Sequence, residues 1–317
     1  MIWRISSILF AFLLFSSCKE KEAVKTIPLP IETLGYHSTR HLIEAKKLKT
    51  VLEEEHIKII DFRKLEEYKA GHIPSALHLW RSDIEDKTYP YKGMAGTKET
   101  LENVISDLGI RPDDIIIIYD DKGLCDAARL WWVLKIHNFN KVKLLNGGWT
   151  DWKNNQGAIS TDVPETSPSK FKFNAAEAKD YLVGKDGLSA VLETKDLILI
   201  DSRTADEFSG KRQKSGAKRG GRIPGSLNID WMEAIRSDNQ KFKARGELEK
   251  IYSQVGVAKD KPIITYCHTG VRSAHMTFVL TELLGYTNVK NYDGSWSEWS
   301  YFDDLPIEKD SVTSVLN

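Results

Sequence analysis

One cysteine of this chain stands where its thiol could become reactive. Cys267 follows the apolar run at residues 262–266, and Gly270 and Arg272 come next, before a helical pattern begins. We therefore expect a short loop between a strand end and a helix start, called here the cysteine loop (residues 267–272). Unpaired backbone N–H groups, the positive end of the helix dipole and the arginine charge would each lower a thiol pKa there. A packed, unreactive cysteine is the alternative interpretation.

The cysteine loop has the composition of a cradle for an anion. In one chemistry, the Cys267 thiolate takes a sulfur atom from an anionic donor and becomes a persulfide, and Arg272 balances its charge. The predicted substrate-binding groups are the backbone N–H groups of His268, Thr269, Gly270 and Val271. In a second chemistry the thiolate attacks a phosphoryl group, as in cysteine phosphatases, whose arginine lies six residues after the cysteine. Here the arginine comes five residues after it, and the shorter loop favours a single sulfur atom.

The elements that carry this loop belong to an internal duplication. Short apolar strands ending in Asp and Arg occur at residues 57–63 and again at residues 197–203. The second halves align without a gap at a separation of 147 residues, which matches Tyr266 with Tyr119 and also pairs two glycines and two tryptophans. Each copy alternates short strands with helical segments, and this pattern predicts two tandem α/β domains with largely parallel sheets.

The duplication breaks at the cysteine loop. Cys267 aligns with Asp120, and Arg272 aligns with Cys125, so the first copy has neither the nucleophile nor the cation. We call its equivalent segment the aspartate loop (residues 120–125). One copy should therefore be active and the other structural. We expect Cys125 to be a small packed residue, and Asp120 either to border the active cleft or to cap the following helix.

The domain boundaries follow from the duplication and from a polar, proline-containing stretch between the copies. We place the N-terminal domain at residues 32–157, a linker at residues 158–173 and the C-terminal domain at residues 174–310. A glycine-containing turn with a tryptophan follows the last strand of each copy, at residues 146–149 and 293–296. We interpret both as turns that pack an aromatic ring.

Composition excludes several functions. The chain has 317 residues with 45 basic and 45 acidic side chains, so its zero net charge argues against a nucleic-acid-binding protein. It contains only three cysteines and lacks the close Cys/His spacing of a zinc site. We therefore expect neither a metal nor a cofactor.

The N-terminus has the pattern of a targeting segment. An apolar run at residues 8–15 follows Arg4, and two serines precede Cys18. This order resembles a bacterial lipobox, which predicts a signal peptide at residues 1–17, acylation of Cys18 and a tether at residues 18–31. The mature protein would then be lipid-anchored in a bacterial cell envelope, on the periplasmic side or at the cell surface. An ordinary signal peptide with an incidental cysteine is the alternative.

Four motifs together resemble a two-domain rhodanese, a thiosulfate sulfurtransferase. They are the cysteine loop, Asp201-Ser202-Arg203, and the segments at residues 221–228 and 291–296. The resemblance implies two rhodanese-like domains, each a mainly parallel five-stranded sheet flanked by helices, with the N-terminal one inactive. It also implies that thiosulfate gives its sulfane sulfur to Cys267 and leaves as sulfite, and that cyanide or a thiol then accepts the sulfur. We expect a monomer whose partners are this donor and this acceptor.

Departures from the family pattern leave the donor open. Glu207 stands where many members have a second donor-binding arginine, and Thr269 stands where some have a lysine. The branch specific for 3-mercaptopyruvate has glycine and serine at the positions of His268 and Thr269, which favours thiosulfate here. A 3-mercaptopyruvate sulfurtransferase and a persulfide carrier remain the alternatives. Arg203 would either contact the donor or pair with a carboxylate of its own domain.

The stretch at residues 211–222 contains six basic residues. It is either a solvated insertion or a basic rim that draws small anions toward Cys267.

Overall fold

The computed structural model describes residues 34–310, except 175–178, 193–195, 254–255 and 260. Cys18, the predicted signal peptide and the predicted tether at residues 18–31 lie outside this range. Within the described residues, none of the helices combines the length and the apolar character needed to cross a membrane.

The first domain is built on a five-stranded sheet in the order β1-β5-β4-β2-β3, and every strand pair in it is parallel. Its elements in chain order are β1 (Leu42–Ile43), α1 (Ala45–Val51), β2 (Ile57–Asp61), α2 (Leu65–Ala70), β3 (Leu77–His78), the 3₁₀ turn η2 (Arg81–Asp83), α3 (Lys98–Asp107), β4 (Ile115–Tyr119), α4 (Cys125–Ile136), β5 (Val142–Leu145) and α5 (Gly148–Asn154).

The second domain repeats this topology with the order β6-β10-β9-β7-β8, again wholly parallel. Its elements are the 3₁₀ turn η3 (Lys179–Tyr181), β6 (Leu182–Val183), α6 (Lys185–Val191), β7 (Ile198–Asp201), α7 (Ala205–Ser209), β8 (Leu227–Asn228), the 3₁₀ turn η4 (Trp231–Ala234), α8 (Arg245–Ser253), β9 (Ile263–Tyr266), α9 (Val271–Phe278), its π-helical continuation η5 (Val279–Leu283), β10 (Val289–Tyr292) and α10 (Ser295–Trp299). The predicted pair of five-stranded α/β domains is confirmed.

Residue chemistry explains why these sheets are parallel and covered. Strand β4 reads Ile-Ile-Ile-Ile-Tyr, without the polar alternation of a half-exposed strand, and four of its five residues are buried. Continuous apolar runs of this kind suit a sheet with helices on both faces. The ends of β4 and of its counterpart β9 lie at the carboxyl edges of their sheets, so the aspartate loop and the cysteine loop both start there.

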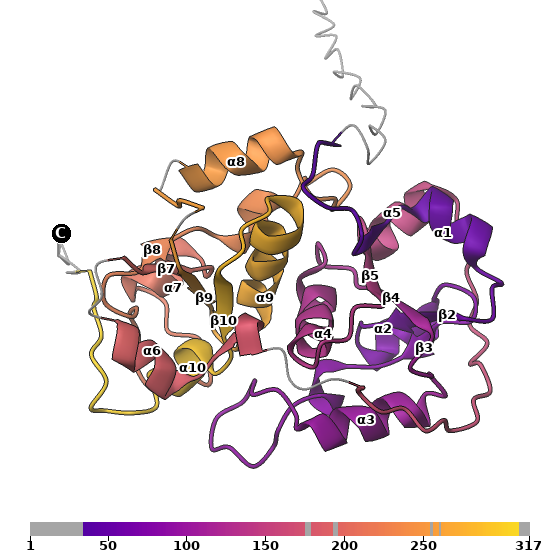
Figure 1. Cartoon of the computed structure of the whole chain (residues 1–317), viewed down its shortest axis with the longest axis horizontal. Coiled ribbons are helices and arrows are strands. Elements are labelled where there is room, and N and C mark those ends of the chain that lie inside the picture. Colours follow the sequence, from indigo (N-terminus) through magenta and orange to yellow (C-terminus); the bar gives the residue numbers. More distant parts are fainter. Residues whose placement is uncertain (1–33, 175–178, 193–195, 254–255, 260, 311–317) are drawn as a thin grey trace, which may run out of the picture.

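The two domains meet through helices α4 and α9, which lie against each other in the middle of the molecule (Figure 1). Trp131 of α4 makes an edge-to-face contact with Phe278 of α9, with ring centroids 4.9 Å apart, and both rings are fully buried. One apolar core cluster runs through this contact and contains residues of both domains. The helices that follow the two loops are thus held rigidly against each other.

The segment predicted as the linker is bound to the first domain over part of its length. The Ser169 N–H donates to the Ser106 carbonyl at 2.8 Å. Phe171 is fully buried and packs against Phe139, with ring centroids 5.6 Å apart. The alternation of large apolar and polar residues explains this, because it lets one face of the extended segment cover the core beside α3.

Candidate active site

Cys267 lies at the carboxyl end of β9 and is fully buried. The chain turns at Gly270, whose φ of +72° belongs to the left-handed region, and α9 begins at the next residue. The loop between the strand end and the helix start is therefore formed as the sequence predicted.

The Cys267 thiol is held in a form that favours the thiolate. Burial raises its pKa, but the Arg272 charge, the Ser273 hydroxyl and the N–H groups of Ser273 and Thr269 together lower it below the ordinary value. The surroundings at the start of α9 thus outweigh the cost of desolvation. Among the predicted N–H donors, the Thr269 group faces the sulfur, whereas the Gly270 N–H donates elsewhere.

Ser295 binds the cysteine loop at its first residue and at its turn. Its Oγ accepts the Cys267 N–H at 3.1 Å and the Gly270 N–H at 3.0 Å, and it donates to the Tyr292 carbonyl at 2.8 Å. Ser295 has a φ of +51°, and its counterpart in the first domain is Gly148 with a φ of +53°. A serine in a conformation that favours glycine is strained, and here its hydroxyl makes three hydrogen bonds that hold it there. Sequence reasoning assigned this segment to a packed turn and missed the residue.

The aspartate loop shows how backbone N–H groups of such a loop can converge on one side chain. The Asp120 Oδ1 accepts the N–H groups of Lys122 and Leu124, and its Oδ2 accepts that of Ala127, each at 2.9 Å. Asp120 therefore caps α4, which was one of its two predicted roles. Burial and the nearby Asp126 raise its pKa to about 7. In the second domain the equivalent cradle encloses sulfur instead of a carboxyl group.

Arg272 lies beside the thiol and also binds a carboxylate. Its two terminal nitrogens bind both oxygens of Glu207, at 2.7 and 2.9 Å. Burial raises the pKa of Glu207, but the paired arginine lowers it to about 2, so the carboxylate stays charged. The arginine charge is thus shared between Cys267 and a buried carboxylate.

Helix α7 explains the placement of Glu207. Thr204 caps this helix by accepting the Glu207 N–H, and its hydroxyl also donates to Glu207 Oε2 at 3.2 Å. The sequence Thr-x-x-Glu is a capping-box pattern, in which the glutamate usually bonds back to the cap residue. Here it extends to Arg272, and the departure noted at position 207 is therefore part of the site.

His268 faces away from the sulfur chemistry. Its Nε2 lies 3.0 Å from the Ser215 carbonyl and must carry the proton, because a carbonyl only accepts. Burial and then Lys214 lower the pKa of His268 to about 4, so the ring is neutral at pH 7. Its ring attaches the basic stretch to the cysteine loop.

Only part of the basic stretch at residues 211–222 is directed at the site. Lys214 lies within electrostatic reach of Cys267 and Arg272, and burial followed by the arginine charge lowers its pKa. Arg219 instead donates to backbone carbonyls that include Leu305 O at 3.1 Å, and Arg222 pairs with Asp310 at 2.6 Å. The stretch therefore combines one cation near the site with others that fasten the C-terminal segment.

Arg203 occupies a structural position. It forms an ion pair with Asp201 at 2.5 Å and donates to the Gly221 carbonyl at 2.7 Å. In the domain without a cysteine, Arg63 repeats these contacts with Asp61 at 2.5 Å and the Gly71 carbonyl at 2.7 Å. Arg203 is also only 2% exposed. Its position matches the carboxylate pairing considered for it and leaves no free face for a donor.

Cys125 is a buried free cysteine at the start of α4. Burial raises the pKa of its thiol, and Asp126 and Asp120 raise it further. This thiol therefore lacks the activation found at Cys267, and the packed role predicted for it matches this position.

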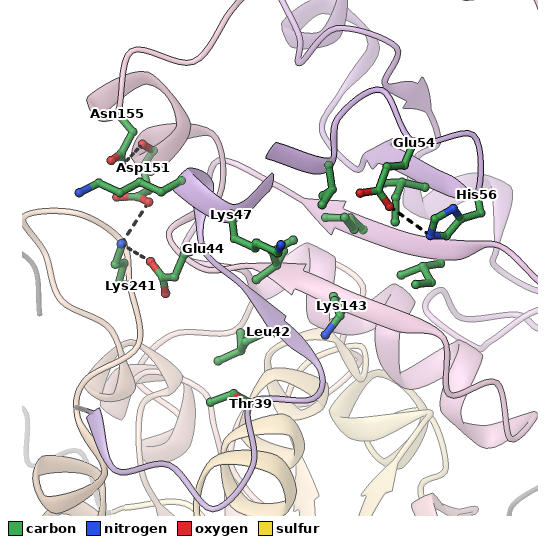
Figure 2. Close-up of a pocket in the computed structure, with 16 residues that line it drawn as sticks. Thr39, Leu42, Glu44, Lys47, Glu54, His56, Lys143, Asp151, Asn155 and Lys241 are labelled. Atoms are coloured by element: carbon green, nitrogen blue, oxygen red, sulfur yellow. Dashed lines mark hydrogen bonds and ion pairs between the residues drawn. The ribbon is translucent and has the colours of Figure 1, made fainter. Parts of the chain in front are cut away.

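A cavity of about 720 Å³ lies against the first domain and is closed at one end by Lys241 of the second, away from the predicted site residues. Its lining includes apolar residues of the sheet and α1, and at one end Lys241 bridges Glu44 and Asp151 (Figure 2). No cysteine lines it. The nucleophile, its cation and the loop N–H groups meet only at the cysteine loop among the described residues.

The fold and the site define a class: a duplicated parallel α/β protein in which one domain carries an activated cysteine in an anion cradle. A family model described as Rhodanese-like domain matches residues 44–155 and 185–301. A thiosulfate sulfurtransferase of Corynebacterium glutamicum is 34% identical over 249 residues, covering 76% of this chain and 81% of that protein. The sulfur carrier protein TtuD of Thermus thermophilus is 32% identical over 286 residues, covering 87% and 99%.

Solved structures agree with these relatives. SseA from Escherichia coli, described among the 3-mercaptopyruvate sulfotransferases, superposes with a TM-score of 0.73 at 31% identity and covers 81% of this chain and 98% of its own. The chain therefore belongs to the rhodanese family, and it is a two-domain sulfurtransferase.

Proposed function

We propose that this sulfurtransferase takes the sulfane sulfur of thiosulfate onto Cys267 and passes it to a thiophilic acceptor such as cyanide or a thiol. The Cys267 thiolate attacks the outer sulfur, the S–S bond of thiosulfate breaks, and sulfite leaves with the bonding electron pair. The acceptor then attacks the persulfide and regenerates the thiolate. The observation that carries the proposal is the lowered pKa of a buried thiol beside Arg272 and the loop N–H groups.

The cysteine loop accounts for the stability of the persulfide. In the aspartate loop, a carboxylate oxygen that lies one bond further from Cβ than a thiol sulfur accepts the N–H groups of Lys122 and Leu124. The matching donors in the cysteine loop are the N–H groups of Thr269 and Val271. The terminal sulfur of a Cys267 persulfide would occupy the place of that carboxylate oxygen and meet the same donors.

The experiment compares the chain with its Cys267→Ala variant. Mixing with thiosulfate should add 32 Da, one sulfur atom, to the Cys267 peptide in mass spectrometry, as the atomic balance above requires. Cyanide should remove this mass and yield thiocyanate over many turnovers. Turnover retained by the alanine variant would contradict the proposal, and Cys125→Ala serves as the matched control that should keep its activity.

Two other donors or roles can be separated by the same assay. The Escherichia coli relative is described among the 3-mercaptopyruvate sulfotransferases, and the Thermus thermophilus relative is described as a sulfur carrier protein. A larger kcat/KM with 3-mercaptopyruvate than with thiosulfate would reassign the donor. A stable persulfide without turnover on small acceptors would indicate a carrier that delivers to a protein partner.

We also propose that Cys18 is acylated and anchors the protein in a bacterial cell envelope. The support is the sequence pattern, an apolar run followed by two serines and Cys18. The full chain should fractionate with membranes, and Cys18→Ala should release it or leave an uncleaved precursor. Equal membrane association and mass for both proteins would contradict the anchor.

A further inference from the structure

The domain without a cysteine extends a charged side chain to the cysteine loop. Arg129 lies in α4 and is only 2% exposed. Its Nη2 binds Asp293 Oδ1 at 2.7 Å and donates to the Gly93 carbonyl at 2.7 Å, and its Nη1 lies 3.4 Å from the Gly270 carbonyl. The guanidinium group also stacks on Trp132, 4.8 Å from the ring centroid. Every one of these contacts is inside the protein.

This ion pair has no counterpart on the other side of the duplication. The residue equivalent to Arg129 in the second domain is Met276, and the residue equivalent to Asp293 in the first domain is Asn146. Both charges are therefore present at the loop that carries Cys267 and absent from the loop that carries Asp120. If the Arg129–Asp293 pair served only to pack the domains together, there would be no reason for it to lie beside the cysteine loop and not beside the aspartate loop.

Arg129 lies against the turn of the cysteine loop. A Cβ atom on Gly270 would come within 2.8 Å of its Nη1 and within 2.6 Å of the Asp293 carbonyl. The Gly270 carbonyl also accepts a hydrogen bond from Asn291 Nδ2 at 3.1 Å. Arg129 and Asn291 thus add two side-chain donors to the Ala274 N–H, which donates to this carbonyl at 3.3 Å from within α9.

The direction of the Gly270 carbonyl determines that of the next N–H. A peptide group is planar and trans, so the Val271 N–H points opposite to the Gly270 carbonyl. The equivalent N–H in the first domain belongs to Leu124, and it donates to the Asp120 carboxylate at 2.9 Å. Leu124 precedes α4 with a φ of +67°, whereas Val271 is the first residue of α9, so whether the Val271 N–H reaches a group in the cradle depends on how the Gly270 carbonyl is held.

Arg129 also neutralises a carboxylate beside the loop. Asp293 is 5% exposed, and its Oδ2 accepts the Ala95 N–H at 2.9 Å. Without the arginine, a buried negative charge would lie next to Gly270 and oppose the formation of a second anion in the cradle.

We propose that Arg129, supplied by the domain that lacks a cysteine, is a positioning residue of the active site. It orients the Gly270–Val271 peptide toward the sulfur and cancels the charge of Asp293. The inference rests on the proposed function, because it assigns the N-terminal domain a part in forming the same persulfide.

The test uses the full chain with Arg129→Met, Arg129→Lys and, as matched control, Lys241→Met. Lys241 is a buried interdomain cation that binds Glu44 at 2.5 Å and Asp151 at 3.1 Å, but it lies beside the turn of the first domain (Figure 2). The readouts are thermal unfolding, the rate constant of persulfide formation with thiosulfate, and the Cys267 thiol pKa. The thiol pKa comes from the pH dependence of iodoacetamide alkylation, followed on the Cys267 peptide by mass spectrometry.

We expect Arg129→Met to slow persulfide formation about tenfold or more and to move the alkylation profile to higher pH. Arg129→Lys keeps the positive charge but loses the planar guanidinium group that binds several partners at once. Its alkylation profile should therefore stay close to that of the parent, while the rate constant of persulfide formation falls. Lys241→Met should lose stability with both catalytic readouts unchanged. Arg129→Met behaving like Lys241→Met would overturn the proposal.

A second variant keeps the test decisive if Arg129→Met does not fold. Arg129→Met combined with Asp293→Asn removes both charges, so we expect it to fold, to restore the alkylation profile and to stay slow in persulfide formation. A parental rate in this double variant would overturn the positioning role. Because alkylation needs no sulfur donor, it still reports on Arg129 if thiosulfate proves not to be the substrate.

Discussion

At the scale of single residues, the site contains a balance of charges around one sulfur atom. Arg272 lowers the thiol pKa, while Glu207 binds the same guanidinium through both of its oxygens. The carboxylate therefore limits how much positive charge the sulfur and an anionic donor experience. Lys214 adds a cation near the sulfur from outside this pair. Donor selection should depend on this group of charges.

Glu207→Gln tests the balance. The amide keeps the shape but removes the negative charge, so the Cys267 thiol pKa should fall further below its ordinary value. The kcat/KM for thiosulfate, a dianion, should rise severalfold. Arg272→Met should change both quantities in the opposite direction. The pH dependence of kcat/KM for the parent, Glu207→Gln and Arg272→Met measures both quantities. If all three proteins lose activity at the same pH on the acid side, the role assigned to the Glu207–Arg272 pair is contradicted.

Substitutions of Ser295 test whether its hydroxyl holds the cysteine loop in place. Ser295→Ala removes the acceptor of the Cys267 and Gly270 N–H groups, which should cost about 1–3 kcal/mol and lower kcat/KM. Ser295→Gly removes the same acceptor but relieves the φ of +51°, worth about 1 kcal/mol. Ser295→Gly should therefore lose as much activity as Ser295→Ala but have a larger free energy of unfolding in denaturant than Ser295→Ala. Full activity in both variants would mean that the hydroxyl does not hold the loop.

At the scale of elements, two equivalent strand–loop–helix units serve different purposes. Each has a glycine with positive φ, Gly270 at +72° and Gly123 at +62°. A Cβ on Gly270 would meet the Asp293 carbonyl at 2.6 Å, whereas one on Gly123 meets side-chain atoms no closer than 3.3 Å. The cysteine loop is thus enclosed by backbone and by Arg129, while the aspartate loop has adjustable neighbours.

Alanine at these two glycines should separate strain from function. Both variants acquire a side chain at positive φ, which costs about 1–2 kcal/mol. Gly270→Ala must in addition displace the cysteine loop, so its kcat/KM should fall at least about tenfold, while Gly123→Ala keeps the parental value. Steady-state assays at saturating acceptor and thermal unfolding of both proteins measure the difference. Equal activity loss in both variants would refute it.

At the scale of the whole molecule, the two domains share one core. The apolar cluster that contains Trp131 of α4 and Phe278 of α9 extends into both sheets. The N-terminal domain therefore packs through this cluster directly against the domain that carries Cys267. We expect a single cooperative unfolding transition instead of two.

Trp131→Ala tests this continuity. Trp131 is fully buried and contacts Phe278 and Tyr181, so truncation should cost about 3–5 kcal/mol and lower the stability of both domains together. Differential scanning calorimetry should show one transition at a lower temperature. Met232→Ala, at a side chain that is 61% exposed, is the control with little change. Two separated transitions in the tryptophan variant would contradict a shared core.

Much of this architecture follows from the sequence alone. The apolar strands ending at Tyr119 and Tyr266, and the helices after them, are local patterns, so they predict both the duplication and the place of Cys267. The presence of Asp120 at the position of Cys267 in the other copy predicts that only the second domain carries the nucleophile. Local patterns suffice here because strand period, turn glycines and helix starts depend on neighbours in the chain.

Other features depended on tertiary structure. The contact of Glu207 with Arg272 joins residues 65 positions apart, and that of Arg129 with Gly270 joins residues 141 positions apart. The structural role of Arg203 follows from its contacts with Asp201 and with the Gly221 carbonyl. Charge pairing is decided by distances between side chains in the folded protein, which no local pattern of the chain specifies. The sequence by itself therefore determined the fold and the place of Cys267 between a strand and a helix, whereas only the packing of α4, α7 and α9 decided which charges surround its sulfur.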